Sequence, residues 1–134
     1  MVHRSLQVVA LAVALLALAA CADKKVDPAI AAVCSTRART QSAVNSSSTA
    51  SVDQYPEVIK GLEDAIKVAP ADIRDDFIRV HDVLKPFVQA LVAAGGNTEV
   101  AAQDPNYAAM VAAVGTKSAT AAAKRIRAFY ADHC

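Results

Sequence analysis

YPEVIKGLEDAIKVAPADIRDDFIRVHDVL, residues 55–84, predicts two amphipathic helices that meet at a single proline. On both sides of Pro70, apolar residues recur at steps of three and four, which is the period of one helical face. The expected core positions are Tyr55, Ile59, Leu62, Ile66 and Ala69 in the first helix, and Ile73, Phe77, Val80, Leu84, Phe87 or Val88, and Leu91 in the second. Because each helix must bury its apolar face against another element, this stretch indicates a helical bundle.

The ends of these two helices are marked by residues with special backbone chemistry. Pro70 ends the first helix and also suits the first turn of the second, where its missing N–H costs nothing. Pro86 interrupts the second pattern, so we expect a kink or a break there. Gly95 and Gly96 supply a C-terminal stop.

An earlier helix is expected to begin at Asp27-Pro28, an N-cap residue followed by proline at the first helical position. Its apolar positions are Ile30, Val33, Cys34, Ala38 and Val44. The serine-rich run 45–49 should end it, because serine, threonine and asparagine side chains compete for backbone hydrogen bonds.

The last third of the chain repeats the same start signal. After a polar loop, Asp104-Pro105 predicts a helix that continues with Tyr107. Residues 115–118 either break this helix or lie within one that runs on towards Cys134. No alternating β-pattern of useful length occurs, so the sequence predicts an all-α bundle of four to five helices.

The N-terminal residues carry a targeting pattern. Arg4 precedes an uncharged apolar run from Leu6, and Leu18-Ala19-Ala20-Cys21 closes it in the manner of a bacterial lipobox. We expect a lipoprotein signal peptide at residues 1–20, a lipidated tether at 21–27 starting with Cys21, and a helical domain at 28–134. The acyl chains on Cys21 would then anchor the domain to the membrane. An ordinary signal peptide with a chance cysteine is the alternative.

The two remaining cysteines, Cys34 and Cys134, form an even count in a chain expected outside the reducing cytoplasm. A disulfide between them would close a loop of roughly 100 residues. Two free thiols are the alternative. A metal site is not expected, because neither cysteine belongs to a C-x-x-C motif.

Several segments together resemble the small helical lipoproteins of actinobacteria, mycobacteria included. They are the lipobox, Cys34 in the first helix, Ala69-Pro70-Ala71-Asp72-Ile73-Arg74, Asp104-Pro105-Asn106-Tyr107, and the run from Arg125 to Cys134. The resemblance covers residues 21–134 and implies the fold, the disulfide and the location on the outer face of the cell membrane. It implies no catalytic residue.

The sharpest candidate for ligand chemistry is Tyr130 with His133, three residues apart on one helix. Phenolate and imidazole both ligate haem iron, so these two residues, with Tyr107 as a third, are a candidate haem or small-ligand site. The alternative is structural: His133 at the negative helix end and Tyr130 packed at the rim.

The other groups of charged residues in the sequence are typical of an exposed helix surface. Asp75, Arg79 and Asp82 have the spacing of an exposed ion-pair ladder on one helix. No G-x-S-x-G elbow and no phosphate-binding loop occurs. We therefore expect neither an enzyme nor a bound cofactor or metal.

The charge balance excludes one class of partner. The chain has fourteen basic and thirteen acidic residues, and Arg4 is the only charged residue before Cys21, so residues 21–134 carry no net charge. A nucleic-acid binder would show a basic surplus. The expected function is a membrane-anchored, extracytoplasmic, non-enzymatic module that docks on an envelope protein such as a transporter or a sensor kinase; the alternative is a small-ligand or haem carrier that uses Tyr130 and His133.

Overall fold

The computed structural model describes residues 26–44 and 52–134, and these residues are helical without any strand. The elements are α2 (Pro28–Val44), the 3₁₀-helix η1 (Val52–Gln54), α3 (Tyr55–Val68), α4 (Ala71–Ala93), α5 (Thr98–Ala101), α6 (Tyr107–Val114) and α7 (Lys117–His133). The all-α fold is confirmed, with six α-helices in the described residues where four or five were expected. The predicted signal peptide, Cys21 and the serine run 45–49 lie outside these residues.

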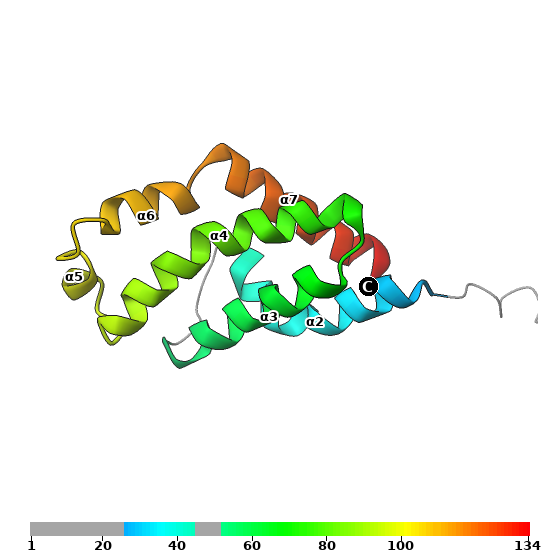
Figure 1. Ribbon diagram of the computed structural model, residues 1–134, viewed down its shortest axis with the longest axis horizontal. Coiled ribbons are helices and arrows are strands. Elements are labelled where there is room, and N and C mark those ends of the chain that lie inside the picture. The colour runs from blue at the N-terminus through cyan, green and yellow to red at the C-terminus, as the bar shows by residue number, and fades with distance from the viewer. Residues whose placement is uncertain (1–25, 45–51) are drawn as a thin grey trace, which may run out of the picture.

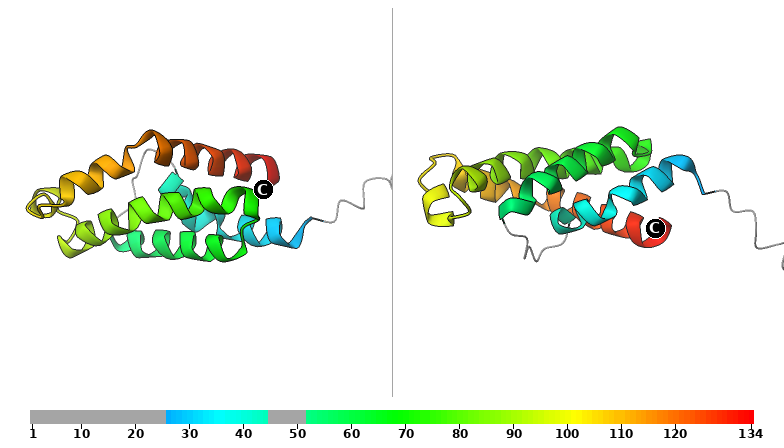
Figure 2. Two further views of the ribbon diagram at one scale, coloured as in Figure 1. Left: turned by 45° about the horizontal axis from the view of Figure 1, so that its top comes forward. Right: turned by 90° about the horizontal axis from the view of Figure 1, so that it is seen from below.

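Four of the helices form a closed ring of neighbours. Helix α2 packs on α3, α3 on α4, α4 on α7, and α7 returns to α2. Helices α5 and α6 lie outside this ring and pack on α4, at the end of the bundle away from α2's first turn (Figures 1 and 2). The core is therefore enclosed by four helices, while α5 and α6 form an extension.

The core contains the apolar positions that the sequence pattern predicts for α3 and α4. Leu62 and Phe77 are fully buried, and Val88 is buried where the pattern left a choice with Phe87. Tyr55, Ile66, Leu84 and Phe87 are partly buried at the edge of the cluster. The remaining buried side chains of this cluster come mainly from α2 and α7: Val33, Ala122, Ile126, Phe129 and Tyr130.

Most helix ends follow the expected local chemistry. The Asp27 carboxylate accepts a hydrogen bond from the Ala29 amide at 2.8 Å, which caps α2. Gly95 and Gly96 have φ values of 60° and 80°, the left-handed conformation that ends α4. Of the kink or break expected at Pro86, the break does not occur: α4 runs through Pro86, because one missing N–H donor is tolerated in a helix of 23 residues packed along its length.

The segment between α4 and α7 adds one helix that was not expected and decides one question that the sequence left open. The polar loop contains the short helix α5, whose N-cap Asn97 accepts hydrogen bonds from the amides of Glu99 and Val100. The segment after Pro105 forms two helices, because Gly115 ends α6 and the Thr116 hydroxyl caps α7 by accepting from the Ala119 amide. Among the described residues, no helix has both the length and the apolar character needed to cross a membrane.

Candidate functional site

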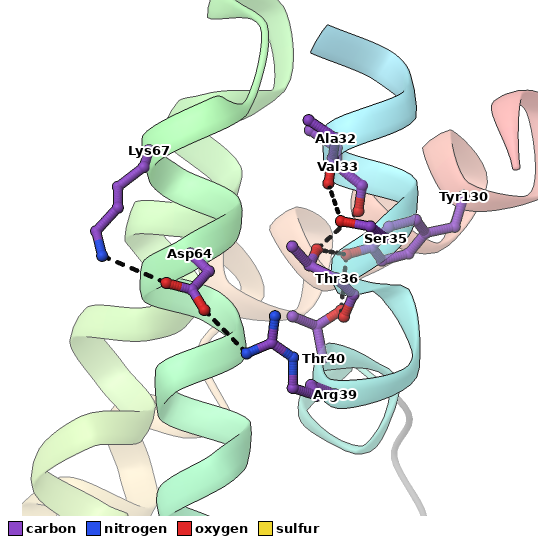
Figure 3. A network of polar contacts seen from close by, with 9 residues as sticks. All are labelled: Ala32, Val33, Ser35, Thr36, Arg39, Thr40, Asp64, Lys67 and Tyr130. Carbon is purple, nitrogen blue, oxygen red and sulfur yellow. Dashed lines mark hydrogen bonds and ion pairs between the residues drawn. The ribbon is translucent and has the colours of Figure 1, made fainter. Parts of the chain in front are cut away.

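The candidate ligand Tyr130 belongs to a buried polar cluster that joins α7 to α2. Its side chain is 3% exposed, and its hydroxyl lies 2.7 Å from the Thr40 hydroxyl and 3.1 Å from that of Thr36 (Figure 3). Thr36 and Thr40 are buried one helical turn apart on α2. The tyrosine ring packs edge-on against Phe77 at 6.0 Å.

The three hydroxyl protons of this cluster can be arranged in one direction. Thr40 donates to Tyr130, Tyr130 donates to Thr36, and Thr36 donates to the Val33 carbonyl at 2.7 Å. Each hydroxyl then gives one proton and the buried oxygens are satisfied. The cluster therefore links α2 and α7 without leaving a polar group unpaired.

The three proposed ligand residues are not brought together. His133 is exposed on the outside of α7, with its ring 4.6 Å from that of Phe129. Tyr107 stacks on Phe87, with ring centroids 5.8 Å apart. Phe87 lies ten residues along α4 from Phe77, the residue that contacts Tyr130, and ten residues of helix span about 15 Å. A haem iron could reach Tyr130 only after its hydroxyl leaves both threonines.

The predicted bridge is present: Cys34 and Cys134 form a disulfide with a Cα–Cα distance of 5.5 Å. It joins α2 to the residue that follows α7, beside the Tyr130 cluster on the same pair of helices. The helices that are farthest apart in the sequence are thus held by one covalent bond and by one set of buried hydrogen bonds.

The ion-pair ladder expected along α4 does not form. Arg79 donates to the Ser118 hydroxyl on α7 at 2.6 Å, and Asp76, buried at 7% exposure, accepts two hydrogen bonds from Arg125. The Asp76 carboxylate raises the pKa of Arg125. These pairs bind α4 to α7 because α7 lies along that face. Among the described residues, no three side chains of histidine, cysteine, aspartate or glutamate lie close enough together to hold a metal ion.

The described surface is hollowed between α3 and α4, and we call this hollow the α3–α4 groove. Its volume is about 630 Å³, within the range of roughly 300–1,000 Å³ that is typical of ligand sites. Apolar side chains contribute to its lining and charged side chains, from both helices, complete it. The lining residues are Pro56, Ile59, Lys60, Glu63, Asp64, Lys67, Lys85, Val88, Gln89, Val92 and Ala93.

Both carboxylates of the groove already have cationic partners. Glu63 accepts from Lys85 at 3.0 Å and lies 3.3 Å from a ring nitrogen of His81. The hydrogen bond from Lys85, followed by that from His81, holds the pKa of Glu63 below its ordinary value.

Asp64 is held in the same way on the side that faces α2. Arg39 donates to it at 2.9 Å and Lys67 at 3.3 Å (Figure 3), and these hydrogen bonds, Arg39 first, lower the pKa of Asp64. Lys60, exposed on the same helix, has no carboxylate partner among the described residues. The groove therefore combines apolar lining with a positive charge that is free to pair with a ligand.

Sequence reasoning missed this groove, although the sequence contains a partial signal for it. Lys60 and Lys67 are seven residues apart and Val88 and Val92 are four apart, so each pair shares a helical face. Those faces become one surface only because α3 and α4 pack antiparallel. Comparison with protein-family models, with curated protein sequences and with solved structures gives no match to this chain.

Proposed function

We propose that this chain is a membrane-anchored extracytoplasmic lipoprotein whose helical domain is a non-enzymatic interaction module, and that the α3–α4 groove is its docking surface. The partner is an envelope protein such as a transporter or a sensor kinase. The observation that supports a docking role is the groove, whose lining includes the exposed Val92 and Lys60, a cation without an ion-pair partner among the described residues.

The chemistry of the groove suits an amphipathic segment of a partner. Apolar residues of such a segment would cover Pro56, Val92 and Ala93, which line the groove and are exposed, Val92 at 41%. An acidic side chain at its edge would pair with Lys60. Glu63 and Asp64, already held by cations, would repel little, because their charges are compensated inside the domain.

The docking proposal is tested by site-specific photocrosslinking in the native membrane. A photoreactive residue replaces Gln89, which is exposed and lines the groove, in the full-length protein. The matched control replaces Lys124, exposed on α7. We expect one envelope protein to be captured reproducibly from position 89 and not from position 124. Equal capture at both positions, or none at either, would refute the groove as the docking surface.

The lipid anchor is tested separately by Cys21→Ala. The expected result is release of the protein from membranes, because the thioether that carries the acyl chains can no longer form. Membranes washed with carbonate and probed for the protein give the measurement. Retention of the variant at the level of the unchanged protein would contradict the anchor.

The carrier alternative is weakened by the placement of its ligands. Tyr130 is buried and hydrogen-bonded, while His133 is exposed. We expect an absorbance titration of the protein with haem to give no saturable Soret change. A saturable change that His133→Ala abolishes would restore the carrier.

A further inference from the structure

Helix α6 is apolar around its whole circumference, yet none of its eight residues is buried. Its sequence is YAAMVAAV, without a single charged residue. The side that packs on α4 contains Tyr107, Met110, Ala113 and Val114, which are only partly buried. The opposite side, which we call the α6 outer face, consists of Ala108, Ala109, Val111 and Ala112 and is exposed.

A helix with apolar residues on all sides is normally buried within a protein or a membrane. The α6 outer face is instead open, with Val111 46% exposed, and Val100 of the preceding helix α5 is exposed to the same extent. A contiguous apolar surface of this kind marks an interaction site. It is distinct from the α3–α4 groove, because no residue of α6 lines that groove and α6 packs mainly on α4.

The charges that flank α6 indicate what covers it. Asp104 precedes the helix and Lys117 follows it, and both are exposed. A membrane surface is disfavoured, because helices that lie on lipid carry basic residues, whereas Glu99 and Asp104 are acidic. If two copies of α6 lie antiparallel, Asp104 of each copy faces Lys117 of the other.

The surroundings of Lys117 are a second argument for the antiparallel arrangement. It is the first residue of α7, where a positive charge opposes the helix dipole, and no acidic residue lies in that first turn. No hydrogen bond or ion pair engages Lys117 within the described residues, so its own domain gains nothing from it. Asp104 uses one oxygen to accept from the Asn106 amide at 2.8 Å, which leaves the other carboxylate oxygen for an outside partner.

We propose that the α6 outer face binds the same face of a second copy of this chain, with the two α6 helices antiparallel about a two-fold axis. The axis passes close to Val111, since the midpoint between residues 104 and 117 falls beside it. Ala108 and Ala112 lie at the middle of the outer face and allow the two backbones to approach, and the two valines meet beside them at the two-fold axis. The contact is isologous, so it closes at a dimer. This inference is independent of the proposed docking role of the groove.

The first test is oxidative crosslinking of the full-length protein in its membrane. Val111→Cys places a thiol beside the two-fold axis and should give a covalent dimer on a non-reducing gel. The matched control is Asp72→Cys, exposed at the other end of α4. A dimer yield at position 111 no higher than at position 72 would overturn the proposal.

The second test measures dimer dissociation of the full-length protein in detergent by sedimentation. Val111→Asp should weaken the dimer roughly thirtyfold, because a charge is then buried at its centre. The folded monomer tolerates this change, since residue 111 is exposed. An unchanged dissociation constant would place the contact elsewhere and refute the α6 interface.

The third test separates the antiparallel arrangement from other pairings. Lys117→Glu sets two like charges against Asp104 of the partner and should weaken the dimer roughly tenfold. Adding Asp104→Asn to Lys117→Glu removes this repulsion, keeps the oxygen that caps Asn106, and should restore most of the affinity. If the double variant dimerises no better than Lys117→Glu alone, the two helices are not antiparallel.

Discussion

At the scale of single residues, Tyr130 shows that spacing along a helix does not reveal which distant residues a side chain contacts. Its distance of three residues from His133 fits a shared ligand site. The structure instead buries Tyr130 against Thr36 and Thr40, and leaves His133 exposed. The threonines that receive the tyrosine hydroxyl lie ninety or more residues earlier in the chain, so no local pattern could identify them.

We predict that Tyr130→Phe destabilises the protein by about 1–2 kcal/mol, the cost of two lost hydrogen bonds whose threonine partners keep backbone acceptors. Tyr107→Phe is the matched control, because the Tyr107 hydroxyl makes no hydrogen bond within the described residues, and it should change stability very little. Urea denaturation of the purified protein measures both. Equal losses in the two variants would refute the structural role of the Tyr130 hydroxyl.

A second residue-scale prediction concerns acid stability. The pKa values of Glu63 and Asp64 are lowered by their cationic partners, so the unfolded chain binds more protons than the folded one as the pH falls. Their contribution is complete above the ordinary pKa of 4.5 for Glu63 and 3.8 for Asp64, and it is lost as the pH falls through the lowered values.

The measurement is the urea midpoint of unfolding between pH 7 and pH 3. The double variant Glu63→Gln with Asp64→Asn should lose less stability on acidification than the unchanged protein. Glu57→Gln is the control, since Glu57 is exposed on the same helix with no ion pair within the described residues. The prediction fails if the double variant and the control have parallel acid profiles.

At the scale of elements, helix boundaries were predictable where one residue determines the backbone. Asp27 caps α2, and Gly95 and Gly96 end α4, as the sequence indicates. Helix α5 was missed because a helix of four residues leaves no periodic pattern. Of the kink or break expected at Pro86, the break did not occur, because packing along α4 outweighs the loss of a single hydrogen bond. Tertiary contacts are not visible in a local motif.

The two glycines after α4 give an element-scale prediction. An alanine at either position must adopt a positive φ, which costs about 1–2 kcal/mol. At Gly96 its Cβ would also collide with the Val52 side chain of η1, whereas at Gly95 it meets no atom within 4 Å. We therefore expect Gly96→Ala to destabilise clearly more than Gly95→Ala in thermal or urea unfolding. Equal effects would mean that the contact between η1 and the α4–α5 turn contributes nothing.

At the scale of the whole molecule, the sequence determined the class of fold but not its assembly. The periodic apolar faces of residues 55–91 were enough to predict an all-α bundle, and the even cysteine count indicated the bridge. The closed order of α2, α3, α4 and α7 was not predictable, since four amphipathic helices can pack in several arrangements. The α3–α4 groove and the Asp76–Arg125 pair depend on that order, so they emerged only with the structure.

The disulfide carries the whole-molecule prediction. Replacing both Cys34 and Cys134 with Ser should destabilise the protein by about 2–5 kcal/mol, because a loop with a sequence separation of 100 is no longer closed in the unfolded chain. Urea unfolding of the purified protein measures this, and reduction of the unchanged protein should shift its midpoint to the same value. An unchanged urea midpoint after both the substitution and the reduction would show that the bridge adds no stability.

The distance along the chain between the two cysteines also determines how much time separates their synthesis. Cys34 is made a hundred residues before its partner. At a synthesis rate of about 5–20 residues per second, its thiol waits roughly 5–20 s before Cys134 exists. Helices α3 and α4 are both synthesised during that interval, before α7 has been translated. The disulfide that joins α2 to the end of α7 therefore cannot form until the rest of the domain has been made.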